Sequence, residues 1–197
     1  MNISLLLKLS VFASLILGVS LFFKVDTPNK ISKDYQRILS NATSGDIIFR
    51  KENSYLSDMF AKVDNSNYSH VGILLKENGK FFVYHMESNT QSEDLKIDPI
   101  EKFLLLAQKT SIYRYSESVD RKRLYALLND YKHQNIKFDY QFDLLNNTLY
   151  CTEFINEVFF KLFSKNIYTY LYNFNSKKII SVKSILQNPN LIKIIEF

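Results

Sequence analysis

Two neighbouring runs of β-branched and aromatic residues give the clearest structural pattern in the chain. They cover residues 68–75 and 81–87, and Asn78-Gly79 lies between them. This dipeptide is the one most typical of a type I′ turn, so the pattern predicts a β-hairpin. A two-residue loop fixes the pairing, and residues face each other when their numbers sum to 157, as 78 and 79 do.

This register gathers polar side chains on one face of the predicted hairpin. Gly72 faces His85 and His70 faces Glu87, and alternation along each strand puts all four residues on the same side. Two of the three histidines thus lie close to a carboxylate. Gly72 between them leaves an open patch that a substrate or another backbone segment can occupy.

The remaining pattern predicts helices mixed with short strands. Helical spacing of apolar residues is found in residues 31–40, 53–63 and 119–131, in a turn at 181–186, and in a helix that begins near Cys151. Short strands are predicted at residues 47–49, 111–115 and 191–195. Asp98, Pro99 and Glu101 are typical of a helix start, with Asp98 as the N-cap. This mixture of helices and short strands predicts an α+β fold class.

Cys151 is the only cysteine and lies where that helix begins. Asn146, Asn147 and Thr148 precede it and are all able to cap a helix. Unpaired N–H groups and the helix dipole in a first turn favour the thiolate, which is the nucleophilic form. The alternative is a buried and inert cysteine, because cysteine is also a small apolar residue.

Composition narrows the class of protein. The chain has 197 residues, 46% of them hydrophobic, which suits one domain with a real core. Lys and Arg exceed Asp and Glu by 25 to 20, and they are scattered without an Arg-rich stripe, so we expect no nucleic-acid partner. A single cysteine forms no internal disulfide.

The N-terminus carries a targeting pattern. Residues 9–23 are uncharged and follow Lys8, as in a signal peptide, and residues 3–23 together are long enough for an uncleaved membrane anchor. Both alternatives stay open. We therefore predict a signal peptide or anchor with a linker at residues 1–28 and one domain at residues 29–197. The domain is expected to be exported, either extracytoplasmic or held at the membrane by residues 3–23.

A helix-borne cysteine near a strand-borne histidine is an arrangement that performs acyl transfer. The thiol attacks a carbonyl carbon, the imidazole takes its proton, and a third polar group orients the imidazole. Zinc is disfavoured because no Cys and His pair has the spacing of a zinc site, so neither a metal nor a cofactor is predicted. No Gly-x-Ser-x-Gly motif supports a serine nucleophile.

Three motifs in order also resemble a known family. They are Gly45-Asp46-Ile47-Ile48-Phe49, Tyr68-Ser69-His70-Val71-Gly72-Ile73, and Phe138-Asp139-Tyr140 followed by Tyr150-Cys151-Thr152-Glu153-Phe154. This resembles the permuted papain-fold cysteine hydrolases, the YaeF/YiiX group related to NlpC-type peptidoglycan peptidases. In the permuted group the histidine precedes the cysteine, as it does here.

The resemblance implies a papain-like fold, in which an antiparallel sheet packs against the helix that begins at Cys151. It also implies Cys151 as nucleophile and His70 as base. The family's third polar residue lies on the next strand, in a context that Val83-Tyr84-His85-Met86 matches, so His85 is the first choice. Glu87 is the alternative, because the hairpin register sets it opposite His70. The backbone N–H of Cys151 is an expected oxyanion donor, and Tyr150 or Tyr140 is a candidate for the second.

Together these observations predict a papain-like cysteine hydrolase that cleaves an amide, ester or thioester bond. Export and kinship favour a peptide bond, with cell-wall peptidoglycan as the first candidate. A lipid-acyl substrate, cleaved or transferred, is the alternative enzymatic reading. A third possibility is a catalytically silent binding module with the same fold.

Overall fold

The computed structural model describes residues 28–53, 55–87 and 94–197. The predicted signal peptide or anchor of residues 3–23 lies outside the described residues. In the part of the chain that is described, no helix has the length and apolar character needed to cross a membrane.

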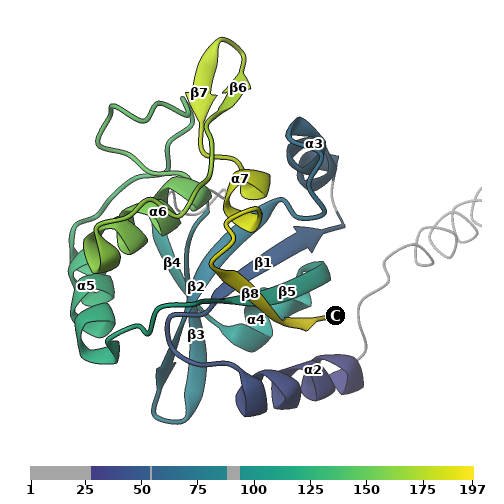
Figure 1. The fold of residues 1–197 in the computed structure, drawn as a ribbon. Coiled ribbons are helices and arrows are strands. Elements are labelled where there is room, and N and C mark those ends of the chain that lie inside the picture. Colours follow the sequence, from purple (N-terminus) through teal and green to yellow (C-terminus); the bar gives the residue numbers. More distant parts are fainter. Residues whose placement is uncertain (1–27, 54, 88–93) are drawn as a thin grey trace, which may run out of the picture.

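An antiparallel sheet forms the centre of the molecule (Figure 1). Among the described residues its strand order is β4-β3-β2-β1-β5-β8. The strands are β1 (Ile47–Glu52), β2 (His70–Glu77), β3 (Lys80–Met86), β4 (Leu95–Pro99), β5 (Ala107–Tyr115) and β8 (Leu191–Glu196). A separate small hairpin consists of β6 (Tyr172–Phe174) and β7 (Lys177–Ile179). The α+β class and the antiparallel sheet are as predicted.

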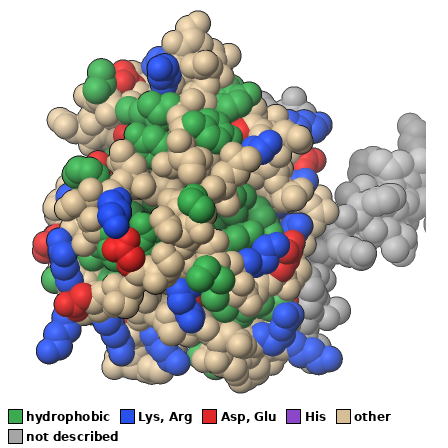
Figure 2. Space-filling model, in the orientation of Figure 1, with side chains coloured by type: hydrophobic (Ala, Val, Ile, Leu, Met, Phe, Trp, Pro, Cys, Tyr) green, Lys and Arg blue, Asp and Glu red, His purple; other side chains and the backbone are tan. Residues whose placement is uncertain are grey.

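Helices cover both faces of this sheet. They are α2 (Pro28–Asn41), α3 (Tyr55–Val63), α4 (Ile100–Leu105), α5 (Arg121–His133), α6 (Cys151–Phe163) and α7 (Val182–Leu186). Alternate strand residues explain the two layers: Ile47 and Phe49 join the core formed with α5, α6 and α7, whereas Ile48 joins the core formed with α2 and α4. The face drawn in Figure 2 shows Lys and Arg dispersed, as the scattered sequence positions predict.

The predicted hairpin is present with the predicted register. Ile73 pairs with Tyr84 and Leu74 with Val83, so the paired numbers sum to 157. Gly72, however, leaves no open patch. A Cβ added there would lie 2.5 Å from Val83 Cγ1 and 3.2 Å from His85 Cβ, so this glycine allows β3 to pack closely against β2.

Two expectations about helix starts are wrong. Asp98 belongs to β4, a strand that sequence patterning missed, and α4 begins at Ile100 with Pro99 as a cap that has no side-chain bond. Helix α6 has Tyr150 at its N-cap, also without a side-chain cap bond, so the polar run 146–148 lies in the preceding loop. The carboxylate of Asp98 has another partner instead, which lies in the candidate site.

Candidate active site

Cys151 is the first residue of α6 and is partly buried. Burial raises the pKa of its thiol to about 11, and the negative charge of Glu87 acts in the same direction. The neighbouring backbone N–H groups, including that of Val71, lower the pKa but do not outweigh burial. The thiol is therefore protonated at neutral pH, and the helix start alone does not produce the thiolate that the sequence pattern favoured.

His70 lines the same cavity as Cys151. It is the first residue of β2 and lies directly opposite Arg50 of β1. The cavity has a volume of about 230 Å³. Its lining is Glu52, Ser57, Phe60, Ser69, His70, Met86, Glu87, Phe138, Phe142, Tyr150 and Cys151. The fold therefore brings together the nucleophile and the base that the family resemblance implies.

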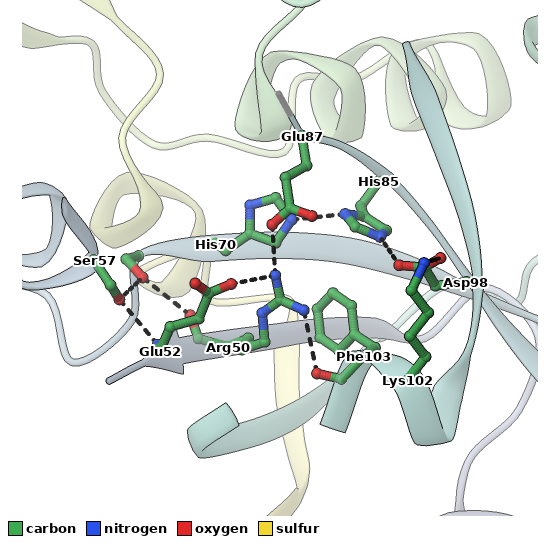
Figure 3. A network of polar contacts seen from close by, with 10 residues as sticks. Arg50, Glu52, Ser57, His70, His85, Glu87, Asp98, Lys102 and Phe103 are labelled. Carbon is green, nitrogen blue, oxygen red and sulfur yellow. Dashed lines mark hydrogen bonds and ion pairs between the residues drawn. The ribbon is translucent and has the colours of Figure 1, made fainter. Parts of the chain in front are cut away.

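His85 contacts His70 on one side and a carboxylate on the other (Figure 3). The distance from His70 Nε2 to His85 Nδ1 is 2.8 Å, and that from His85 Nε2 to Asp98 Oδ2 is 3.3 Å. Asp98 also accepts a 2.7 Å hydrogen bond from Lys102. The chain of contacts therefore runs from a surface lysine through Asp98 and His85 to His70.

The protonation states of Asp98, His85 and His70 follow from these contacts and from burial. The hydrogen bond from His85 lowers the pKa of Asp98 to about 2, so Asp98 is an ionised acceptor and His85 Nε2 carries a proton. Burial lowers the pKa of His85, and its neutral ring offers Nδ1 as an acceptor for His70 Nε2–H. Burial, followed by the charge of Arg50, lowers the pKa of His70 well below its ordinary value. Neutral His70 then keeps a free lone pair on Nδ1, which is the atom that can take a proton.

Glu87, the alternative third residue, is bound to a different partner. Its Oε1 lies 2.6 Å from the Nη2 of Arg50, which is fully buried. The same guanidinium also pairs with Glu52 and donates to the backbone oxygen of Phe103 at 3.2 Å (Figure 3). The structure therefore gives His85, and not Glu87, the direct hydrogen bond with His70.

The two tyrosines considered as oxyanion donors differ in position. Tyr150 lines the cavity with its ring, but its hydroxyl accepts a 2.8 Å hydrogen bond from the N–H of Ile180. Tyr140 is 57% exposed, packs against Phe138 and is not part of the cavity lining. Neither contact assigns an oxyanion role, which for both residues stays a prediction.

Sequence reasoning missed three residues that shape this site. Arg50 lies one position beyond the predicted strand 47–49, Asp98 was interpreted as a helix cap, and Phe103 belongs to none of the motifs. A longer β1 was the available signal, since continuing its alternation places Arg50 on the face of His70. Phe103 packs beneath both imidazoles, with centroid distances of 6.0 Å to His70 and 5.2 Å to His85.

One group of side chains in the described part of the chain has donor atoms close enough to share a metal ion. His70, His85 and Glu87 each offer one such atom, and all three lie within 4.8 Å of one another. A set of two histidines and one glutamate is a known donor set of catalytic zinc. The contacts of Glu87 and of the imidazoles oppose that use here, because Glu87 Oε1 already contacts Arg50 and the facing nitrogens of the two imidazoles already share a hydrogen bond.

Comparison with known proteins agrees with the predicted fold and family. The described fold is similar to the crystal structure of metalloprotein yiiX from Escherichia coli O157:H7, with a TM-score of 0.66 and 18% sequence identity over 79% of this chain and 97% of that one. No curated protein matches the sequence. A family model of permuted papain-like amidase enzymes matches residues 41–194. Because that match covers most of the chain, this protein belongs to the permuted papain-like amidases, the YaeF/YiiX or C92 family.

Proposed function

We propose that the protein hydrolyses amide bonds through a thioester intermediate on Cys151, with His70 as the base and His85 as the residue that orients it. The observation that carries this proposal is the shared cavity: Cys151 and His70 line it together, and His85 contacts the Nε2 of His70, which leaves His70 Nδ1 without that partner. Membership of an amidase family supports amide bonds over other acyl compounds.

The reaction begins from a neutral thiol and a neutral imidazole. As Cys151 Sγ attacks the carbonyl carbon, the Nδ1 of His70 takes the thiol proton, and the backbone N–H of Cys151 binds the oxyanion. The imidazolium passes its proton to the departing amine, and the acyl group stays on sulfur. Water then attacks the thioester while His70 takes a proton from it, and release of the carboxylic acid restores the thiol.

Asp98 stabilises the charged intermediate of this cycle. When His70 becomes an imidazolium, its Nε2–H bond to His85 strengthens, and His85 in turn donates to ionised Asp98. The positive charge is thus partly compensated without a second proton leaving the site. Asp98 and His85 act by orienting and stabilising His70, as the third member of a triad does.

The substrate in this proposal is a peptide, with cell-wall peptide as the first candidate. Glu52 and Glu87 are both partly exposed and line the cavity beside an aromatic wall that includes Phe60 and Phe142. Such a cavity favours a substrate that presents an amine over one that presents a carboxylate. The predicted export of the domain, resting on the apolar residues 9–23, belongs to the same proposal.

A lipid-acyl substrate is the second candidate. A small apolar crevice of about 60 Å³ adjoins the cavity at Cys151. Val63, Ile179, Ile180 and Val182 contribute to its lining. An acyl chain placed there would leave its carbonyl carbon beside the thiol, and a membrane anchor would bring the site to a lipid surface.

A substrate screen separates these candidates. The full chain is incubated with muropeptides, with N-acyl amides and with fatty-acyl esters, and products are identified by mass spectrometry. We expect cleavage of a peptide amide by wild type, retention of that activity in His133→Gln, and its loss in Cys151→Ala and His70→Gln. His133 is an exposed histidine outside the cavity and serves as the matched control. Cleavage of esters alone would favour the lipid-acyl reading, and no cleavage of any class would favour the silent binding module.

A further inference from the structure

The guanidinium of Arg50 is a buried cation in the middle of the candidate site. Its residue has no exposed surface, and its Nη2 contacts both Glu87 and Glu52. On another side its central carbon lies 4.1 Å from the centroid of the Phe103 ring, a cation–π distance. Nη1 donates to the backbone oxygen of Phe103. Contacts on several sides therefore hold the cation in the site.

The contact with Arg50 makes Glu87 a poor ligand for a metal ion shared with His70 and His85. The Oε1 of Glu87 lies 2.6 Å from the guanidinium and so already has a charged partner, which it shares with Glu52. A divalent ion on His70, His85 and Glu87 would have to compete for this carboxylate. It would also place two further positive charges near a buried one, where interactions between charges are screened less than in water.

The geometry of the two imidazoles also suits a hydrogen bond between them and not coordination of one metal ion by both. Their facing nitrogens, His70 Nε2 and His85 Nδ1, are 2.8 Å apart, and one proton lies between them. Two nitrogens on one tetrahedral zinc ion, each about 2.0–2.1 Å from it, are about 3.3–3.4 Å apart and both lack the proton. Binding a metal would break the hydrogen bond that orients the base.

We propose that Arg50 is a positioning residue that serves as the resident cation of this site: it holds Glu87 away from the imidazole pair and thereby excludes a divalent metal ion from His70, His85 and Glu87. The structural relative yiiX is described as a metalloprotein. In this chain, by contrast, we expect no metal ion on these three residues. Removing the guanidinium releases Glu87 and completes a set of two histidines and one carboxylate. Metal binding is measured without turnover, so the inference stands or fails independently of the proposed hydrolysis.

The test is a titration of the full chain with Co²⁺, whose visible absorption reports ligation by nitrogen and oxygen, followed by competition with Zn²⁺. Wild type and Arg50→Lys, which both keep a cation, are expected to show no site of this kind. Arg50→Met is expected to bind one equivalent at least ten-fold more tightly than wild type. The double variant Arg50→Met/Glu87→Gln should lose that gain, which assigns the new ligand.

Two results would overturn the inference. The first is a one-to-one Co²⁺ complex of wild type as tight as that of Arg50→Met. The second is an equal gain in the double variant, which would mean that Glu87 is not the ligand released. Because Arg50 is buried and Arg50→Met can fail to fold, circular dichroism accompanies each titration. In that case the wild-type and Arg50→Lys titrations decide, since a specific complex with His70 and His85 in either one contradicts exclusion and its absence supports it.

Discussion

His70 Nε2 lies 2.8 Å from His85 Nδ1, and His85 Nε2 lies 3.3 Å from Asp98. These two contacts determine which nitrogen of each imidazole carries a proton, because ionised Asp98 requires a hydrogen-bond donor at His85 Nε2. Each neutral ring then accepts on one nitrogen and donates on the other. His70 Nδ1 is left as the available base.

The first prediction concerns the third residue. His85→Gln removes the ring that accepts from His70, so we expect kcat/KM to fall by about 10²-fold while the fold is retained. Glu87→Gln keeps the shape of a side chain that contacts Arg50 and is expected to change kcat/KM by less than about 10-fold. Steady-state kinetics on a cleaved peptide measures both. The reverse order of the two effects would make Glu87 the orienting residue.

A second prediction concerns Asp98. Asp98→Asn removes the charge that His85 meets, so kcat is expected to fall by about 10-fold, with little change in KM. The loss of two charge-assisted hydrogen bonds should also lower the free energy of unfolding by about 1–3 kcal/mol. Urea unfolding measures the second effect. Lys102→Met is the control, because it removes the lysine contact of Asp98 but leaves the contact with His85; a loss of kcat equal to that of Asp98→Asn would assign the effect to the lysine.

The thiol gives a third prediction. With the pKa of Cys151 raised to about 11 by burial, labelling by iodoacetamide is expected to be slow at pH 7 and to rise about ten-fold per pH unit up to pH 10. A free thiol such as glutathione, labelled in parallel, should reach its plateau earlier. Labelling of Cys151 that is already at its plateau near pH 6 would instead show a thiolate–imidazolium pair.

Protein stability should depend on pH through the two histidines. The folded pKa values of His70 and His85 lie below their ordinary value, so the unfolded chain binds more protons in the acid range. Their stabilisation is complete above about pH 6.5 and decreases as the pH falls from there towards the folded values, by up to about 1.4 kcal/mol per pH unit for each histidine.

Urea unfolding of wild type and His70→Gln between pH 5 and 8 measures this dependence. The variant lacks one of the two titrating groups and should show the shallower slope. His133→Gln, which changes an exposed histidine, should keep the slope of wild type. Equal slopes in wild type and His70→Gln would mean that His70 keeps an ordinary pKa in the folded protein.

Local sequence signals were sufficient for part of this site. Asn78-Gly79 specifies a turn by backbone chemistry alone, and with the turn fixed the strand register followed, bringing His70 and His85 to one face. The helix at Cys151 follows from its apolar spacing, and its place beside the hairpin was implied by the family resemblance. Those predictions depended on short-range geometry or on a complete motif.

The rest of the site depends on partners that are distant in sequence. Arg50 reaches Glu87 only because β1 extends past Phe49 and pairs with β2, and a strand end is the least certain part of a sequence prediction. Asp98 precedes a proline and has the sequence of a helix cap. In β4, however, it lies two positions after Lys96, which pairs with His85, so alternation places its carboxylate on the face of His85. Burial, which decides the pKa of Cys151, is likewise a property of the packed structure.

The most direct test of the account is to trap the acyl-enzyme. Wild type is mixed rapidly with a cleaved amide substrate, or with its activated ester, quenched in acid and mapped by peptide mass spectrometry. We expect an acyl adduct on the peptide that contains Cys151, and a loss of about 10³-fold or more in kcat for Cys151→Ala, while His133→Gln forms the adduct as wild type does. Hydrolysis that continues in Cys151→Ala at the wild-type rate, or an adduct on another residue, would contradict it.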